Sequence, residues 1–298
     1  MPYLLLTLSA LIWSGNFVIS RAMNAVIPPA GFVFWRWVIA IIVLAPIALP
    51  RLRKEWPIIR GNLRFVSLCG LFSVTLFNFL IYTAMHYTTA INAALVNSAI
   101  PVFILMFARI IFSQRVSLRQ HLGIALSLCG VAAIILQGDL SRLLMLHFNR
   151  GDLLVLVAAV VWALYSVLLR KFPAGLNPFV FLFAISVAGL VFLIPFYAWE
   201  LASGHFLTIN TATILSIGYV GILASVVAFS AWTSGLRSVG AHLGGQFIHL
   251  MPAFSTILAV LFLGERLRMF HVAGIVLIFA GILCATFRVQ PAAAAKPK

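Results

Sequence analysis

The second half of this 298-residue sequence repeats the first, and the repeat limits the folds that the chain can adopt. When Pro101 is placed over Pro252, a shift of 151, the next thirty residues align without a gap. Upstream, Pro29 falls on Pro178 at a shift of 149. Each copy has an apolar segment with an early proline, a short basic turn and an apolar segment with spaced glycines. Chance similarity between apolar segments would not keep prolines and glycines in register, so the sequence predicts a duplication of one unit.

Composition places both copies in a membrane. Hydrophobic residues make up 63% of the chain and charged residues 8%, whereas soluble domains have ~25% charged residues. Apolar runs near the ~20 residues that cross a bilayer predict spans at roughly 3–21, 31–49, 63–83, 90–111, 119–137, 152–169, 178–199, 212–233, 242–263 and 271–288. Such runs are too long and too uniformly apolar for barrel strands. The predicted fold is an all-α polytopic membrane protein with ten transmembrane helices.

The distribution of cations predicts the topology. The formal net charge of +15 would suggest nucleic acid as a partner of a soluble protein, but in a membrane protein it indicates orientation. With the N-terminus inside, fourteen of the twenty Lys and Arg residues face the cytoplasm, which favours cytoplasmic N- and C-termini. Five spans per half is an odd number, so the two halves are expected to be inverted five-helix repeats, an architecture of secondary transporters. The predicted boundaries are residues 1–138 for the first repeat, 139–151 for a connecting loop, 152–288 for the second repeat and 289–298 for a disordered cytoplasmic tail.

Three local motifs resemble those of EamA-type permeases in the drug/metabolite transporter superfamily. They are Pro-x-Phe early in the fourth and ninth spans, Leu-Gly-Glu-Arg-Leu from Leu263 to Leu267, and Trp13-x-x-Asn16 in the first span. The first-half turn departs from the family pattern, because Gln114 stands where these proteins often carry Glu. The resemblance implies export of amino acids, other metabolites or toxic compounds through a central cavity between the halves, in the bacterial cytoplasmic (inner) membrane.

Polar and aromatic side chains recur at helical spacing along several spans, and facing lipid would be costly for them. The candidate substrate-binding residues are Trp13, Asn16, Asn78, Tyr82, Asn97, Trp162, Tyr165, Trp232, Gln246 and His249. Pro101 and Pro252 are candidate gating positions, because proline frees a backbone carbonyl one turn earlier. The alternatives are packing or an interfacial belt for the aromatic rings, helix–helix hydrogen bonds for the amides and a satisfied core histidine for His249. Arg36 is expected to snorkel to the outer interface, or to attract a carboxylate at the outer mouth.

All five acidic residues fall in loops or at span ends, so no span carries a carboxylate at mid-depth. Tight proton coupling through Asp or Glu is therefore not expected, which leaves His249, another relay or no coupling. The favoured function is a secondary transporter that exports small neutral or zwitterionic metabolites by alternating access. Aromatic walls and amides suit amino acids with apolar or aromatic side chains. The alternatives are an efflux carrier for drugs or other metabolites, and a channel-like facilitator.

The sequence lacks the residues that enzymes, metal-binding proteins and nucleotide-binding proteins require. No Ser or His pair has the spacing of a catalytic nucleophile and base, so an enzyme is not expected. The three cysteines lie in apolar runs without ligand spacing, and no nucleotide-binding fingerprint occurs. The sequence therefore predicts no metal, no cofactor and no nucleic acid. Its expected partners are a small-molecule substrate and the lipid bilayer, and the expected oligomeric state is a monomer or a weak homodimer.

Overall fold

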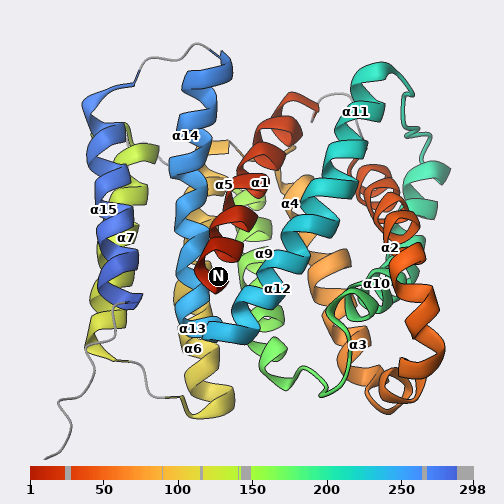
Figure 1. The fold of residues 1–298 in the computed structure, drawn as a ribbon. Coiled ribbons are helices and arrows are strands. Elements are labelled where there is room, and N and C mark those ends of the chain that lie inside the picture. The colour runs from red at the N-terminus through yellow and green to blue at the C-terminus, as the bar shows by residue number, and fades with distance from the viewer. Residues whose placement is uncertain are drawn as a thin grey trace, which may run out of the picture.

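The computed structural model describes residues 1–23, 28–88, 90–114, 117–139, 141, 149–263 and 267–286. All regular elements in these ranges are helices (Figure 1). The basic turn at 264–266, Arg115 and the predicted tail at 289–298 lie outside the described residues.

The first half contains α1 (Pro2–Met23), α2 (Pro29–Gly61), α3 (Leu63–Gly70), η1 (Leu71–Leu76), α4 (Phe77–Ala84), α5 (Ala90–Asn97), α6 (Ile100–Phe112) and α7 (Leu118–Ile135). The second half contains α9 (Arg150–Leu168), η2 (Leu169–Lys171), α10 (Pro178–Ala202), α11 (Thr211–Tyr219), η3 (Val220–Val227), α12 (Ala228–Val239), α13 (Ala241–Gly244), η4 (Gly245–His249), α14 (Leu250–Leu263) and α15 (Met269–Thr286). Among the described residues, eight helical segments are long and apolar enough to cross a membrane. Helix α1 occupies the range predicted for the first span, and the range predicted for the ninth span is divided among α13, η4 and α14.

The second span is longer than predicted. The sequence placed its end at residue 49, but α2 continues as a helix through Pro50 and Pro57 to Gly61. Each proline removes one backbone donor, and the three prolines inside α2 are far enough apart for the bonds between them to hold the helix together. The extension carries Arg51, Arg53 and Lys54, so it is a polar continuation of an apolar span.

Two carboxylates tie the ends of α2 and α10 together. Glu200, near the end of α10, accepts hydrogen bonds from the backbone N–H groups of Ala30 and Gly31 at 2.9 and 2.6 Å. Glu55, near the end of α2, accepts from the backbone N–H of Asn177 at 2.8 Å, directly before α10. A carboxylate is favourable at a helix N-terminus because it satisfies free donors and complements the helix dipole. Since the end of each helix meets the start of the other, α2 and α10 run antiparallel.

Helices α7 and α15 form a second close antiparallel pair at the opposite edge of the bundle (Figure 1). A Cβ added at Gly123 would lie 2.5 Å from the carbonyl oxygen of Gly281, and one added at Gly130 would lie 2.6 Å from that of Gly274. Only glycine permits two helix backbones to come this close. The spaced glycines of both segments therefore lie at the contact between these two helices.

Several of the central helices are interrupted. Segments η1 and η3 are π-helical turns within otherwise α-helical spans. The break between α5 and α6 lies at Ser98 and Ala99, two residues before Pro101, and η4 ends at His249, three residues before Pro252. Proline lacks a backbone N–H and is therefore accepted in the first turn of a helix, so each proline lies at the start of the helix that follows the break.

Candidate functional site

Arg36 is a buried cation in the interior of the helix bundle. It lies seven residues into α2, about 10 Å from the start of that helix, and only 1% of its surface is exposed. Its Nε donates to the hydroxyl of Ser225 at 2.9 Å. Its Nη1 donates to Oδ1 of Asn78 at 2.8 Å and to the hydroxyl of Tyr82 at 3.1 Å. These three bonds hold the guanidinium between the two halves of the chain.

The residues that hold Arg36 depend on the π-helical turns. The amide of Asn78 donates to the carbonyl oxygens of Ser73 and Val74 in η1, at 2.7 and 2.9 Å, which fixes Oδ1 toward Arg36. Ser225 belongs to η3 and donates to the carbonyl of Val220 in the same turn at 2.8 Å. A π-turn leaves backbone carbonyls available to side chains, and such turns are frequent at functional sites.

No described carboxylate neutralises Arg36. Each of the four described carboxylates binds near a helix end or in a loop: Glu55 at Asn177, Asp139 at Ser141, Asp152 at Asn149 and Glu200 at Ala30. A guanidinium has five N–H groups, and the two on Nη2 of Arg36 have no acceptor among the described residues. Removing an ion from water costs several kcal/mol, so an unpaired cation in this position points to function rather than stability.

Arg36 lines a cavity of about 40 Å³ between the two halves. The first half contributes Trp13, Asn16, Arg36, Phe77, Asn78, Asn97 and Ile100, and the second half contributes Trp162, Phe229, Ile248 and Met251. This volume admits only a few water molecules, whereas sites for small molecules are usually about 300–1,000 Å³. The helices would therefore have to separate before a metabolite could enter.

Aromatic rings form most of the cavity wall. Trp13 and Trp162 meet edge to face at 5.2 Å, and Phe77 lies 4.5 Å from Trp162. The indole N–H of Trp13 is bound to the carbonyl of Ala224 in η3 at 3.0 Å. The indole N–H of Trp162 and Oδ1 of Asn97 are buried without a partner. The cavity thus combines apolar surface with a free donor, a free acceptor and one cation.

The structure brings together half of the residues that the sequence nominated. Trp13, Asn16, Asn78, Asn97 and Trp162 line the cavity. Tyr82 lies behind them and donates to Asn16 at 3.3 Å, while Tyr165 and Trp232 pack against Trp162. Gln246 and His249 are fully buried and are not among the residues that line the cavity. His249 donates from Nε2 to the carbonyl of Ser98 at 3.0 Å, so it links the two proline-containing segments.

The predicted position of Arg36 is wrong. The side chain was expected to reach the outer interface, but it is directed into the protein because Ser225, Asn78 and Tyr82 offer acceptors there. The sequence contained an indication of these internal acceptors, since Asn78 and Tyr82 lie on one face of the third span and Ser225 lies in the eighth. Phe77 and the aliphatic residues of the cavity wall were not nominated, because an apolar lining residue cannot be told from a core residue by pattern.

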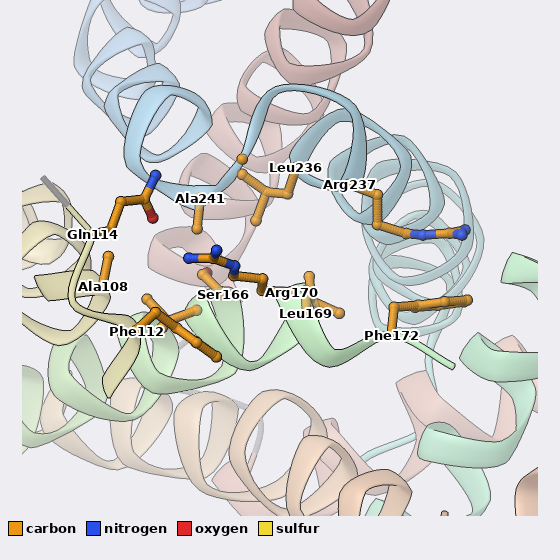
Figure 2. Close-up of a pocket in the computed structure, with 12 residues that line it drawn as sticks. Ala108, Phe112, Gln114, Ser166, Leu169, Arg170, Phe172, Leu236, Arg237 and Ala241 are labelled. Carbon is orange, nitrogen blue, oxygen red and sulfur yellow. The ribbon is translucent and has the colours of Figure 1, made fainter. Parts of the chain in front are cut away.

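A second, larger cavity of about 250 Å³ lies where α6, α9 and α12 end (Figure 2). Its lining includes Gln114, Ser166, Arg170 and Arg237. Among the described residues, no group of three or more His, Cys, Asp or Glu side chains could hold a metal ion.

Apolar helices around a buried polar site that joins both halves define an integral, polytopic helical membrane protein. The chain belongs to the EamA-like transporter family, which matches residues 1–136 and 149–287. This match confirms the resemblance noted from the sequence motifs and places the chain in the drug/metabolite transporter superfamily.

Individual relatives agree with this assignment. The uncharacterized transporter YyaM of Bacillus subtilis is 26% identical over 95% of this chain and 93% of its own length. The uncharacterized inner membrane transporter YedA of Escherichia coli K12 is 25% identical over 92% of this chain and 87% of its own length. A probable terminal-alkyne amino-acid exporter of Streptantibioticus cattleyicolor is 26% identical over 93% of this chain and 91% of its own length. A solved crystal structure superposes with a TM-score of 0.76 at 20% identity, covers 96% of this chain and 97% of that chain, and has the same fold.

Proposed function

We propose that this protein is a secondary transporter that exports small zwitterionic metabolites, with apolar or aromatic amino acids as the preferred class. The observation that carries the proposal is the unneutralised Arg36 in the wall of a cavity shared by both halves. A substrate carboxylate can accept charge-assisted hydrogen bonds from the N–H groups of Nη2, which have no other described acceptor. The cost of burying this cation is then offset whenever substrate is bound.

The remaining groups of an amino acid also have counterparts in the cavity. Oδ1 of Asn97 is an unpartnered acceptor suited to an ammonium group. An apolar or aromatic side chain can replace the mutual contacts of Trp13, Phe77 and Trp162. The relative named as a probable amino-acid exporter supports the same class of cargo.

We infer that the two halves are inverted five-helix repeats within ten transmembrane helices. Pro29 and Pro178 begin α2 and α10 at equivalent positions of the repeat, and these helices run antiparallel. Helices α7 and α15, the last of each half, are antiparallel as well. Antiparallel counterparts are expected from a two-fold axis in the membrane plane. The segments that carry Pro101 and Pro252 would then rock about this axis, and the excess of cations predicts cytoplasmic termini in the inner membrane.

Counterflow in liposomes tests the proposal. Purified protein is reconstituted, vesicles are preloaded with unlabelled L-phenylalanine, and uptake of labelled L-phenylalanine is followed. Phenethylamine, which lacks the carboxylate, and phenylpropionate, which lacks the ammonium group, are matched competitors. We expect saturable counterflow that phenylpropionate inhibits better than phenethylamine.

Two outcomes would reject the proposal in different ways. If no amino acid moves while another metabolite or drug does, the substrate class is wrong. If flux occurs without saturation or counterflow, the protein is a channel-like facilitator rather than an alternating-access carrier.

A further inference from the structure

The larger cavity contains cationic groups that the central site does not use. It lies between the end of α6 and the ends of α9 and α12 (Figure 2). Arg170 and Arg237 line it, and no carboxylate is among the described residues of its wall. The cavity therefore presents positive charge within a concave surface of about 250 Å³.

Both guanidinium groups lie against aromatic rings. Cζ of Arg170 is 4.9 Å from the ring centre of Phe112, and Cζ of Arg237 is 3.6 Å from that of Phe172. A ring contact uses the face of a guanidinium and leaves the N–H groups at its edge open. Neither arginine donates a hydrogen bond to a described residue, so these donors are available to a ligand.

Ser166 provides an independent sign of a missing partner. The residue is fully buried and lines the cavity, yet its hydroxyl has no hydrogen-bond partner. It precedes Arg170 by four residues: Ser166 lies in the last turn of α9, and Arg170 lies in η2, directly after that helix. Figure 2 shows the guanidinium of Arg170 lying across the cavity from Gln114, close to Ser166. A ligand oxygen between Arg170 and Ser166 would accept from both.

The ends of the surrounding helices do not cancel this charge. Each helix C-terminus carries about half a negative charge, and α6, α9 and α12 all end at this cavity. Arg170 and Arg237 in the cavity wall carry two positive charges, which exceed the roughly 1.5 negative charges of the three helix ends.

We propose that this cavity is an oxyanion-binding site, in which Arg170 and Ser166 bind a phosphate-type group and Arg237 adds positive charge at the rim. Inorganic phosphate in solution and the phosphodiester of an anionic lipid present the same oxygen chemistry. The site is distinct from the central cavity, and its occupancy does not depend on the identity of the exported substrate.

Arginine footprinting tests the proposal on the full chain in lipid nanodiscs. Phenylglyoxal modifies accessible arginines, and peptide mass spectrometry reports the modification rate of each. One arm compares sodium phosphate with sodium chloride at equal ionic strength in phosphatidylcholine discs. The other arm replaces part of the phosphatidylcholine with phosphatidylglycerol and omits phosphate. Arg53, exposed on the extension of α2, is the internal control in the same molecule.

We expect protection of Arg170 with no comparable protection of Arg53. Protection by phosphate identifies a soluble ligand, and protection only by phosphatidylglycerol identifies a lipid headgroup. The Ser166→Ala variant should need about tenfold more ligand for the same protection, because it loses one hydrogen bond to a charged group. Arg36→Gln should keep the protection, so failure of the central site can be recognised separately. Equal protection of Arg170 and Arg53, or none in either arm, would overturn the proposal.

Discussion

Replacing Arg36 by glutamine is the sharpest test of the central site, because it separates a substrate-binding role from a structural one. The substitution removes the only charge in the described part of the cavity wall. It keeps a polar side chain that can donate to Asn78 or Ser225. A variant that folds and fails to bind carboxylate would show that the charge serves the substrate.

The expected effect on transport follows from the free donors of Nη2. A hydrogen bond to a charged group contributes about 1.5–3 kcal/mol. Glutamine is shorter and uncharged, so at least one charge-assisted hydrogen bond to the carboxylate is lost. The half-saturation concentration should then rise about tenfold to a hundredfold, since about 1.4 kcal/mol corresponds to a factor of ten.

The Arg36→Gln substitution is expected to raise the stability of the protein slightly or to leave it unchanged. Arg36 is 1% exposed and lacks a described counter-charge, so its removal relieves a desolvation cost of several kcal/mol. Against this, an acceptor left without a donor costs about 1–3 kcal/mol. The unfolding midpoint in detergent should therefore not fall, whereas a purely structural arginine would lower it.

The assay is amino-acid counterflow in liposomes, measured together with the unfolding midpoint. Arg53→Gln is the matched control, because it makes the same change on the exposed extension of the same helix. Both properties of the control should remain at the wild-type level. An Arg36→Gln protein with wild-type half-saturation for a carboxylate substrate would refute the role assigned to this side chain.

Three further predictions concern packing, helix ends and the cavity wall. Gly130→Ala should lower the unfolding free energy by about 1–3 kcal/mol, because its Cβ would lie 2.6 Å from a carbonyl oxygen of α15. Gly218→Ala is the control and should be neutral in the same denaturation assay, because a Cβ added there meets nothing within 4 Å. Glu200→Gln should lower the unfolding midpoint more than Glu55→Gln, because Glu200 accepts two backbone hydrogen bonds and Glu55 accepts one; an equal loss would contradict the helix-end argument. Trp162→Phe should lower the unfolding midpoint only through the ring contacts that the smaller side chain loses, because the lost N–H has no partner. A counterflow affinity at the wild-type level would contradict a role for this N–H in binding the substrate.

Much of the fold could be predicted because long apolar runs in the sequence identify membrane helices. Prolines and glycines added detail, since Pro101 and Pro252 mark helix breaks and Gly123 and Gly130 mark the contact of α7 with α15. The length of α2 could not be predicted from hydropathy, because its last turns are polar and are held in part by the contact of Glu55 with Asn177.

The site was less predictable for a different physical reason. Side chains such as Trp13 and Asn97 could be nominated from their polarity and spacing, because lipid excludes them. The environment of Arg36 depends on groups from two other spans, and the sequence does not show their distances. A long cationic side chain can reach either an interface or an internal acceptor, and only the tertiary structure selects between them.

The bonds of Arg36 give substrate binding a direct route to helix geometry. Asn78 is bound to the carbonyl oxygens of η1, and Ser225 belongs to η3, so one guanidinium joins both π-helical turns. These turns begin at Leu71 and Val220, which are 149 positions apart and therefore equivalent in the repeat. A π-turn is a rare interruption of an α-helix and is frequent at functional sites. A substrate carboxylate that pulls the guanidinium toward the cavity would weaken its bonds to Asn78 and Ser225 together, and both spans could then change shape in the same step.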